Sequence, residues 1–291
     1  MQITLNKFLL KNIKALFHST KREFKLESQF GSWLVDHYQD ILTINKANNT
    51  IGMDIVAKRR LYVELCKDFD EVLLNCEPED LDRLQMSNLY SNEKLAGINP
   101  NDYFVLLKTI NTPLTCIDSH LNLVNGFAVR APIEQIDNHL IKQLVVVENQ
   151  IVFDNIHKAK LPIELQQAVF IYRGHDHLAT GCYQLLRQLS TLNAKGEVSI
   201  IAFCDFDPAG LQIALTLPNC NKLIVPNLNE ELLAKNSVND FLQQHSNMEF
   251  LNNTQNNAIA EIFDNIKNNK LSIKQEHMLA QDNELKLLSL S

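Results

Sequence analysis

The chain has 291 residues, of which 45% are hydrophobic and 21% charged, and its formal net charge is −7. These values are typical of a globular protein with one large or two smaller domains, and they argue against a protein that coats nucleic acid unaided. The longest apolar runs are far shorter than the roughly 20 residues of a membrane span, and six scattered cysteines without a C-x-x-C pair favour a reduced, cytoplasmic protein.

The first 60 residues are more basic than the rest of the chain. They carry ten Lys or Arg against five acids, so their net of +5 leaves −12 for the remaining residues. Such an asymmetry is compatible with a phosphate-facing surface in the N-terminal part, and equally with solvated helix faces.

The N-terminal part is predicted to be mainly helical. Apolar residues recur at near-helical spacing from Leu5 to Tyr38, which predicts two helices, and further helices are expected over residues 54–68, 80–89 and 100–110. Asn125-Gly126 lies between two short alternating runs and predicts a hairpin over residues 121–131. Helices followed by a hairpin are compatible with a winged-helix module, so residues 1–138 are interpreted as a region that binds DNA or a partner.

The pattern changes after Pro132 to alternating strands and helices. Strands are predicted over residues 143–149, 168–174, 198–204 and 223–227, with helices over 162–167, 180–192 and 208–217, and a helical tail from Asn229. This alternation predicts an α/β domain over residues 139–291, with a mainly parallel, doubly wound sheet between helices.

Acidic and basic residues follow three of these strands directly. Glu148 ends the first, Arg173-Gly174 the second, and Asp205-x-Asp207 the third. Because ligands of open α/β sheets bind at the carboxyl ends of the strands, we expect these groups to converge. Clustered carboxylates repel one another unless a cation neutralises them, which points to Mg²⁺. The alternatives are that Asp207 caps a helix beginning at Pro208, and that Glu148 marks a strand leaving the core.

The motifs VVVEN, YRGHDHLATGCYQLLRQL and IIAFCDFDPAGLQIA occur in this order between residues 145 and 214. Together they resemble the Toprim domain of the topoisomerase VI A-subunit and Spo11 group, over residues 140–227. The resemblance implies DNA chemistry that depends on Mg²⁺ or Mn²⁺, with Glu148, Asp205 and Asp207 as metal-binding and catalytic residues. Arg173 and the Gly174 loop would contact phosphate, and Arg59 and Arg60 are further candidates for binding nucleic acid.

A C-terminal segment, LSIKQEHML at residues 271–279, resembles the Glu-Gln-Glu-Arg element of the JetD family, the nuclease subunits of Wadjet plasmid-defence complexes. Here the element reads Lys274-Gln275-Glu276-His277, so its first acid and final arginine are absent. Glu276 is either a further catalytic residue or part of a solvated helical turn. The resemblance implies partner subunits of the SMC ATPase type.

Three functions follow from these observations. The first is a metal-dependent DNA endonuclease acting on double-stranded DNA, alone, as a homodimer or with SMC-type partners. The second is a transesterase that uses Tyr62 as its nucleophile, because Arg59-Arg60-Leu61-Tyr62 is similar to the Arg-x-x-Tyr-Tyr pattern of the Spo11 group; the alternative places Tyr62 on an amphipathic helix face. The third is a non-catalytic Toprim scaffold that binds DNA or assembles partners.

Overall fold

The computed structural model describes residues 3–254 and 257–290 and divides the chain into two compact units, Met1–Pro100 and Asn101–Ser291. The expected division between residues 138 and 139 differs from this one, because two strands between residues 104 and 132 join the large sheet of the second unit. None of the helices in the described ranges is both long and apolar enough to traverse a bilayer.

The first unit combines helices with a small antiparallel sheet of strand order β1-β3-β2. Its strands are β1 (Glu23–Lys25), β2 (Thr43–Asn45) and β3 (Thr50–Gly52). Its helices are α1 (Lys7–His18), α2 (Gln29–Tyr38), α3 (Ile55–Asp68), α4 (Glu71–Asn75) and α5 (Arg83–Leu89). Short 3-10 turns cover Gln39–Ile41, Pro78–Asp80 and Glu93–Leu95.

Side-chain caps explain where the three main helices of this unit begin. Asn6, Ser28 and Asp54 each accept a hydrogen bond from the backbone N–H three residues on, at 2.7–2.9 Å. The apolar faces of α1, α2 and α3 meet in one core. The two helices predicted between residues 5 and 38, and the helix over 54–68, are therefore confirmed, with β1 as an addition between the first two.

The second unit contains a seven-stranded mixed sheet of order β12-β11-β10-β8-β9-β4-β7. Its strands are β4 (Phe104–Lys108), β7 (Val129–Pro132), β8 (Gln143–Val147), β9 (Val169–Tyr172), β10 (Ser199–Phe203), β11 (Cys220–Pro226) and β12 (Leu285–Ser289). The central strands β11, β10, β8 and β9 are parallel, whereas β12 at one edge and β4 and β7 at the other pair antiparallel. The expectation of a mainly parallel sheet thus holds only for its centre.

Two local predictions in this unit are wrong. The helix expected over 100–110 is strand β4, whose Val105 and Leu107 are buried where β4 pairs with both β7 and β9. The hairpin expected over 121–131 does not form, although Gly126 has the positive φ of a turn. The flanking strands pair elsewhere: β6 (Ser119–Leu121) pairs with β5 (Leu114–Cys116), and β7 pairs with β4. Tertiary pairing overrides both local signals.

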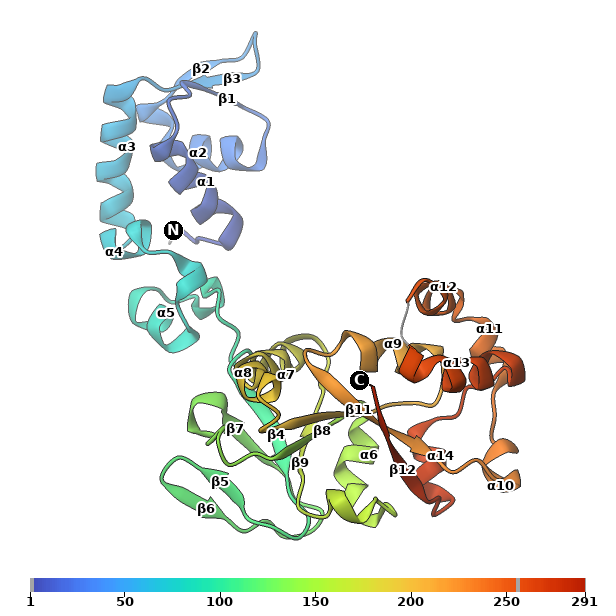
Figure 1. The fold of residues 1–291 in the computed structure, drawn as a ribbon. Helices are drawn as coiled ribbons and strands as arrows, with labels where there is room; N and C mark the ends of the chain where they lie inside the picture. The colour runs from blue at the N-terminus through green and yellow to red at the C-terminus, as the bar shows by residue number, and fades with distance from the viewer. Residues whose placement is uncertain (1–2, 255–256, 291) are drawn as a thin grey trace. The chain divides into compact units, whose positions relative to one another are not determined.

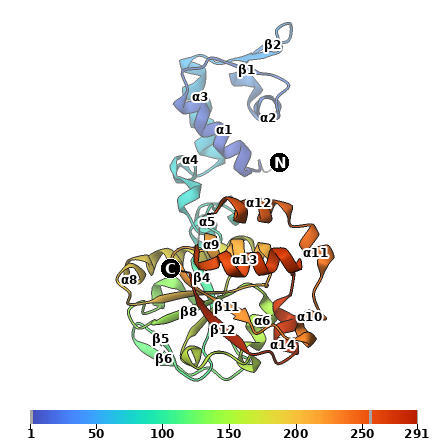
Figure 2. The same cartoon turned by 45° about the vertical axis from the view of Figure 1, so that its right-hand side comes forward.

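Helices of the second unit surround the sheet in both views (Figures 1 and 2). They are α6 (Gln150–Asn155), α7 (Asp176–Gln188), α8 (Ser190–Ala194), α9 (Pro208–Thr216), α10 (Glu230–Leu233), α11 (Val238–Leu242), α12 (His245–Asn253), α13 (Asn257–Asn269) and α14 (Gln275–Ala280). Short 3-10 turns cover Ile133–Gln135, Ile156–Lys158 and Ile163–Leu165. The tail is helical as expected, except that it ends in β12, which pairs with β11. With helices around it, the centre of the sheet is fully buried, which explains the continuous apolar runs of β8 and β10.

Candidate functional site

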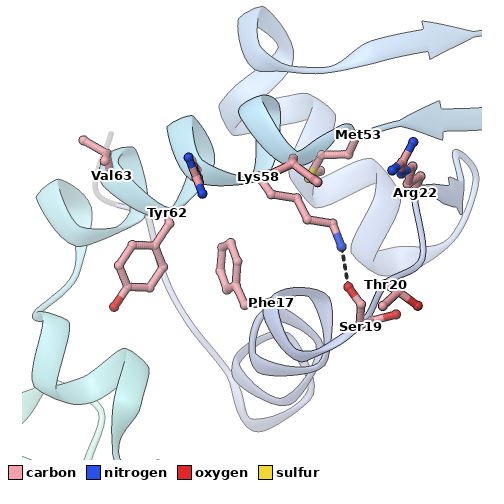
Figure 3. Close-up of a pocket in the computed structure, with 10 residues that line it drawn as sticks. Phe17, Ser19, Thr20, Arg22, Met53, Lys58, Tyr62 and Val63 are labelled. Atoms are coloured by element: carbon pink, nitrogen blue, oxygen red, sulfur yellow. Dashed lines mark hydrogen bonds between the residues drawn. The ribbon is translucent and has the colours of Figure 1, made fainter.

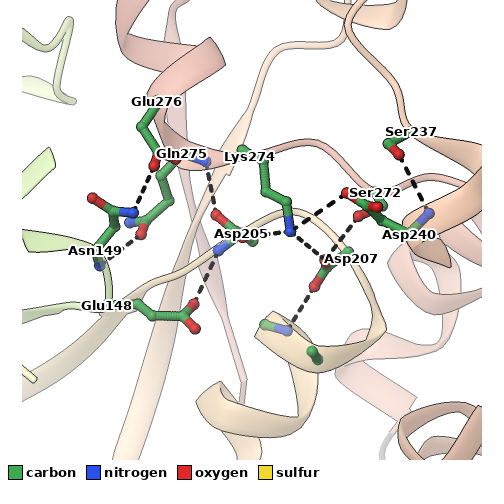
Figure 4. Close-up of polar contacts among 12 residues, drawn as sticks. Glu148, Asn149, Asp205, Asp207, Ser237, Asp240, Ser272, Lys274, Gln275 and Glu276 are labelled. Atoms are coloured by element: carbon green, nitrogen blue, oxygen red, sulfur yellow. Dashed lines mark hydrogen bonds and ion pairs between the residues drawn. The ribbon is translucent and has the colours of Figure 1, made fainter. Parts of the chain in front are cut away.

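Two acidic residues meet at the carboxyl ends of the neighbouring parallel strands β8 and β10 (Figure 4). Glu148 directly follows β8, and its N–H donates to the carbonyl of Phe203, the last residue of β10, at 3.0 Å. The N–H of Asp205 in turn donates to Oε2 of Glu148 at 3.3 Å. The register of the two strands therefore brings together residues that are 57 positions apart in the chain.

Asp207 lies in the same loop but has a different environment. It is 1% exposed and is the N-cap of α9, where its Oδ1 accepts from the N–H of Gly210 at 2.8 Å. Its Oδ2 accepts from Nε2 of Gln244 at 2.7 Å and from Oγ of Ser272 at 2.9 Å. The capping alternative is therefore correct for Asp207, and the same carboxylate also bonds to two further segments of the unit, at Gln244 and Ser272.

Two glycines allow the backbone to pack closely around these strand ends. A Cβ on Gly210 would lie 2.0 Å from the carbonyl oxygen of Asp205, so the turn from Asp205 into α9 leaves no room for a side chain. Gly174 has a φ of +79°, and a Cβ there would lie 2.6 Å from the Cβ of Leu178 in α7. Both glycines are therefore required by local geometry.

The segment formed by residues 272–276 crosses the strand ends, and we call it the C-terminal crossing segment. Ile273 forms an antiparallel bridge with Phe206, with N–H to O distances of 2.8 and 3.2 Å in the two directions. Ser272 on one side of this bridge bonds to Asp207. On the other side the chain enters α14 immediately after Lys274. The bridge therefore fixes the backbone of Lys274 opposite the Asp-x-Asp loop.

Gln275 is the central anchor of this segment and is completely buried. Its side-chain Nε2 donates to the carbonyl of Phe203 at 2.9 Å, and its Oε1 accepts from the N–H of Asn149 at 3.0 Å. Its backbone N–H donates to Oδ1 of Asp205 at 2.8 Å. One residue thus ties the ends of β8 and β10 to α14.

Two cations lie against the acidic residues. Nη2 of Arg173 is 3.8 Å from Oε1 of Glu148, while its Nε is buried and has no hydrogen-bond partner among the described residues. Nζ of Lys274 is 3.3 Å from Oδ2 of Asp205 and 3.9 Å from Oδ2 of Asp207. Arg173 thus contacts a carboxylate of the site, and Gly174 forms the turn that follows it.

Glu276 joins the site indirectly. Its Oε1 accepts from Nδ2 of Asn149 at 2.6 Å, while its Oε2 is buried and lacks a partner within the described parts of the chain. Oδ1 of Asn149 caps α6 by accepting from the N–H of Ile151 at 2.8 Å. Glu276 is therefore linked through Asn149 to the end of β8, and it makes no hydrogen bond or ion pair with Glu148, Asp205 or Asp207 in the described structure.

The two cations, Arg173 and Lys274, only partly balance the negative charge of the acidic residues at the site. Burial raises the pKa of Glu148, and the nearby Asp205 raises it further, against the opposing effect of Arg173. Burial also raises the pKa of Asp205, although the Gln275 amide and Lys274 oppose it. Burial alone would lower the pKa of Lys274, but Asp205, Asp207 and Asp240 outweigh it and raise that pKa. Among the described residues, no three His, Cys, Asp or Glu side chains are grouped as a metal-binding set.

The remaining sequence candidates lie in the first unit, on α3. Arg59 and Arg60 are exposed, and neither forms an ion pair within residues 3–254 and 257–290. A pocket of about 680 Å³ is lined by Arg22, Arg59 and Tyr62, together with Ser19, Thr20 and apolar side chains. Figure 3 is a close-up of this pocket. Lys58 lies in this pocket too, but its Nζ donates to the carbonyl of Ser19 at 2.7 Å beyond the end of α1.

Tyr62 lies on the face of α3 that meets Phe17, with ring centroids 5.1 Å apart and nearly perpendicular rings (Figure 3). Its hydroxyl accepts from Nδ2 of Asn75 at 3.0 Å, which lowers its pKa. Burial, Cys66 and Glu71 outweigh that effect and leave the pKa of Tyr62 above its ordinary value. A nucleophilic hydroxyl needs the opposite shift or an adjacent base, and the hydroxyl of Tyr62 donates to Oε1 of Glu71 at 3.4 Å.

The sequence prediction missed most of the polar residues that organise this site. Ser272, Lys274 and Gln275 contact the strand-end acids directly, and Gln244 bonds to Asp207. The sequence pointed to this region only through the resemblance of residues 271–279 to the JetD element, and that resemblance suggested Glu276 as the candidate residue.

A comparison with protein families matches residues 102–287 to a family described as a domain of unknown function (DUF7281). The match covers almost all of the second unit, including every strand of its large sheet except the last two residues of β12. A search of curated proteins gave no match.

Proposed function

This chain belongs to the family described as a domain of unknown function (DUF7281), and we propose that it is a divalent-metal-dependent DNA endonuclease of the Toprim type. The observation that carries the proposal is the direct contact of Glu148 with the Asp-x-Asp loop at the ends of two neighbouring parallel strands. That is the edge of an open α/β sheet at which ligands bind.

The fold supports both halves of this proposal. Four parallel strands with helices around them and acidic residues at their carboxyl ends agree with a Toprim-like domain. In the first unit, a hairpin of β2 and β3 beside α1, α2 and α3 agrees with a winged-helix module that binds duplex DNA. The hairpin of that module is then residues 43–52, not the expected 121–131.

The donor set at the strand ends fits Mg²⁺ or Mn²⁺. These hard cations take oxygen ligands, and Mg²⁺ is usually held by one or two carboxylates together with waters and phosphate oxygens. Glu148 and Asp205 would hold the ion, since the two residues are in direct contact at the strand ends and Oδ2 of Asp205 has only the ammonium group of Lys274 beside it. Asp207 has most of its acceptor capacity filled by Gly210, Gln244 and Ser272, so it supports the site by fixing the loop. A bound ion would polarise a phosphodiester and activate a water for attack.

The remaining residues have binding and positioning roles in this proposal. Arg173 forms an ion pair with Glu148, and its guanidinium would contact a phosphate bound at the strand ends. Arg59 and Arg60 are free to contact the DNA backbone. Because the chain as a whole is acidic, partner subunits of the SMC ATPase type would supply additional DNA affinity.

The test is cleavage of supercoiled plasmid by the purified chain, with and without SMC-type partners. We expect nicked or linear DNA with Mg²⁺ or Mn²⁺, none with EDTA, and free ends without attached protein. A protein–DNA adduct that survives denaturant and disappears in Tyr62→Phe would instead establish a tyrosyl transesterase. No cleavage under any of these conditions would contradict both enzymatic functions.

A non-catalytic scaffold is the second candidate, because Lys274 already supplies positive charge to the Asp-x-Asp loop. Such a protein would bind DNA or partners without a divalent ion. It predicts that calorimetry detects no Mn²⁺ binding that depends on Asp205.

A further inference from the structure

The ammonium group of Lys274 lies among three carboxylates (Figure 4). Its Nζ is 3.3 Å from Asp205, 3.9 Å from Asp207 and 3.9 Å from Asp240. No other lysine or arginine in the described parts of the chain forms an ion pair with Asp205 or Asp207. Lys274 is therefore the counter-ion of the Asp-x-Asp loop in the structure.

The backbone of Lys274 is fixed, whereas its side chain has room to move. On one side of it Ile273 bridges Phe206, and on the other the buried Gln275 bonds to Phe203, Asn149 and Asp205. The side chain, in contrast, is 38% exposed, and its ammonium group is at the end of a flexible four-carbon stem. The ammonium group can leave the carboxylates without unfolding the C-terminal crossing segment.

A divalent cation and this ammonium group would compete for the same carboxylate. Oδ1 of Asp205 is occupied by the Gln275 N–H, and the other oxygen, Oδ2, is the one that Lys274 contacts. Like charges that share a partly buried site repel one another. Binding of a metal ion at Asp205 therefore requires Lys274 to move away.

We propose that Lys274 is a built-in competitor of the divalent ion: it balances the Asp-x-Asp loop in the metal-free protein and must be displaced when the ion binds. This inference rests on the proposed metal site and adds its regulation. It predicts that the natural chain binds metal more weakly than its carboxylates alone would allow.

The test is titration of the full-length chain with Mn²⁺ in a calorimeter. In Lys274→Gln the dissociation constant for Mn²⁺ should fall by about tenfold, within the ordinary range of coupling between two sites. The matched control is Lys160→Gln, which removes the same charge from an ion pair with Asp282 and contacts no strand-end acid. Its dissociation constant should equal that of the natural chain.

A second variant tests whether the charge of Lys274, and not the loss of its side chain, determines the affinity for Mn²⁺. It also serves if Lys274→Gln folds poorly. Lys274→Arg keeps the positive charge, so its Mn²⁺ affinity should stay close to that of the natural chain. Thermal unfolding in EDTA should show a lower Tm for Lys274→Gln than for Lys160→Gln, because the carboxylates lose their counter-ion.

The outcomes distinguish this inference from the proposed function. Unchanged or weaker Mn²⁺ binding by Lys274→Gln, with binding by the natural chain intact, overturns the inference and leaves the metal site standing. Binding by Lys274→Gln but not by the natural chain supports the inference and contradicts a metal-dependent natural enzyme. Absence of binding in the natural chain, Lys274→Gln and Lys274→Arg overturns both.

Discussion

At the scale of single residues, Asp207 and Asp205 lie in one loop but have different surroundings. Asp207 is buried and accepts hydrogen bonds from a helix N-terminus, a glutamine and a serine. Asp205 is more exposed, and one of its oxygens is held only by the ammonium of Lys274. Asp207 therefore contributes mainly to the structure of the loop, and we propose that Asp205 contributes mainly to ligand binding.

This difference predicts a large stability effect for Asp207→Ala. The change removes the cap of α9, worth about 1 kcal/mol, and leaves the buried hydroxyl of Ser272 without an acceptor, at about 1–3 kcal/mol. The amide of Gln244 loses the same acceptor but is only half-buried, so water can replace it. We expect the free energy of unfolding in EDTA to fall by about 2–4 kcal/mol in urea denaturation. Asn229→Ala, which removes an exposed cap from α10, is the control and should cost only about 1 kcal/mol. Equal losses in the two variants would contradict this account of Asp207.

The acids also make the metal-free protein sensitive to pH. The folded pKa values of Glu148 and Asp205 are raised, so their contribution to stability is full below the unfolded values near about 4 and is lost as pH rises through the folded ones. In EDTA, the Tm of the natural chain should fall between mildly acidic and neutral pH as these acids ionise. We expect this fall to be smaller in Glu148→Gln, which has no carboxyl group at this position. An identical profile in the natural chain and the variant would show that the carboxyl is not destabilised by burial.

At the scale of elements, the C-terminal crossing segment holds the strand ends in place. Gln275→Ala removes two buried side-chain hydrogen bonds, to Phe203 and from Asn149, and leaves a cavity. We expect a loss of about 2–4 kcal/mol and faster hydrogen exchange at the amide of Asn149. The exposed Gln243→Ala in the second unit serves as the control and should stay within about 0.5 kcal/mol of the natural chain. Unchanged exchange at Asn149 in Gln275→Ala would contradict the anchoring role.

Sequence patterns predicted the elements that a local run or spacing of apolar residues marks, and they failed where a distant strand partner decides the structure. β8, β9, β10 and β11 were found from their apolar runs, and α1, α2 and α3 from helical spacing. β4 was mistaken for a helix, and β12 was missed, because each is defined by a neighbouring strand that is distant in sequence.

The same limit applies to the site. Glu148 and Asp205 could be expected to meet, since adjacent parallel strands end at one edge. Lys274 and Gln275 approach them only because a bridge between Phe206 and Ile273 brings a segment about 70 residues away back to the sheet. No local pattern in the sequence specifies that bridge.

At the scale of the whole molecule, the proposed function assigns DNA binding to the first compact unit and metal-dependent cleavage to the second. The first unit carries the exposed Arg59 and Arg60, and the second carries the strand-end acids. Arg59→Gln with Arg60→Gln should weaken binding to duplex DNA and reduce the slope of log affinity against log salt by about 1 for each phosphate that is no longer neutralised. Fluorescence anisotropy at several salt concentrations measures both, and Mn²⁺ binding should not change. A salt slope equal to that of the natural chain would place the DNA-binding surface elsewhere.

The central claim is that Asp205 serves metal-dependent cleavage of DNA, and the most direct measurement is the rate of plasmid cleavage in Mn²⁺ by Asp205→Asn. The matched control is Asp240→Asn, which removes the same charge from a carboxylate that also contacts Lys274 but does not lie at a strand end. We predict that Asp205→Asn loses cleavage by at least about a hundredfold, as expected for loss of a group that stabilises the transition state, while Asp240→Asn keeps most of it. Cleavage by Asp205→Asn at the rate of the natural chain would contradict the claim.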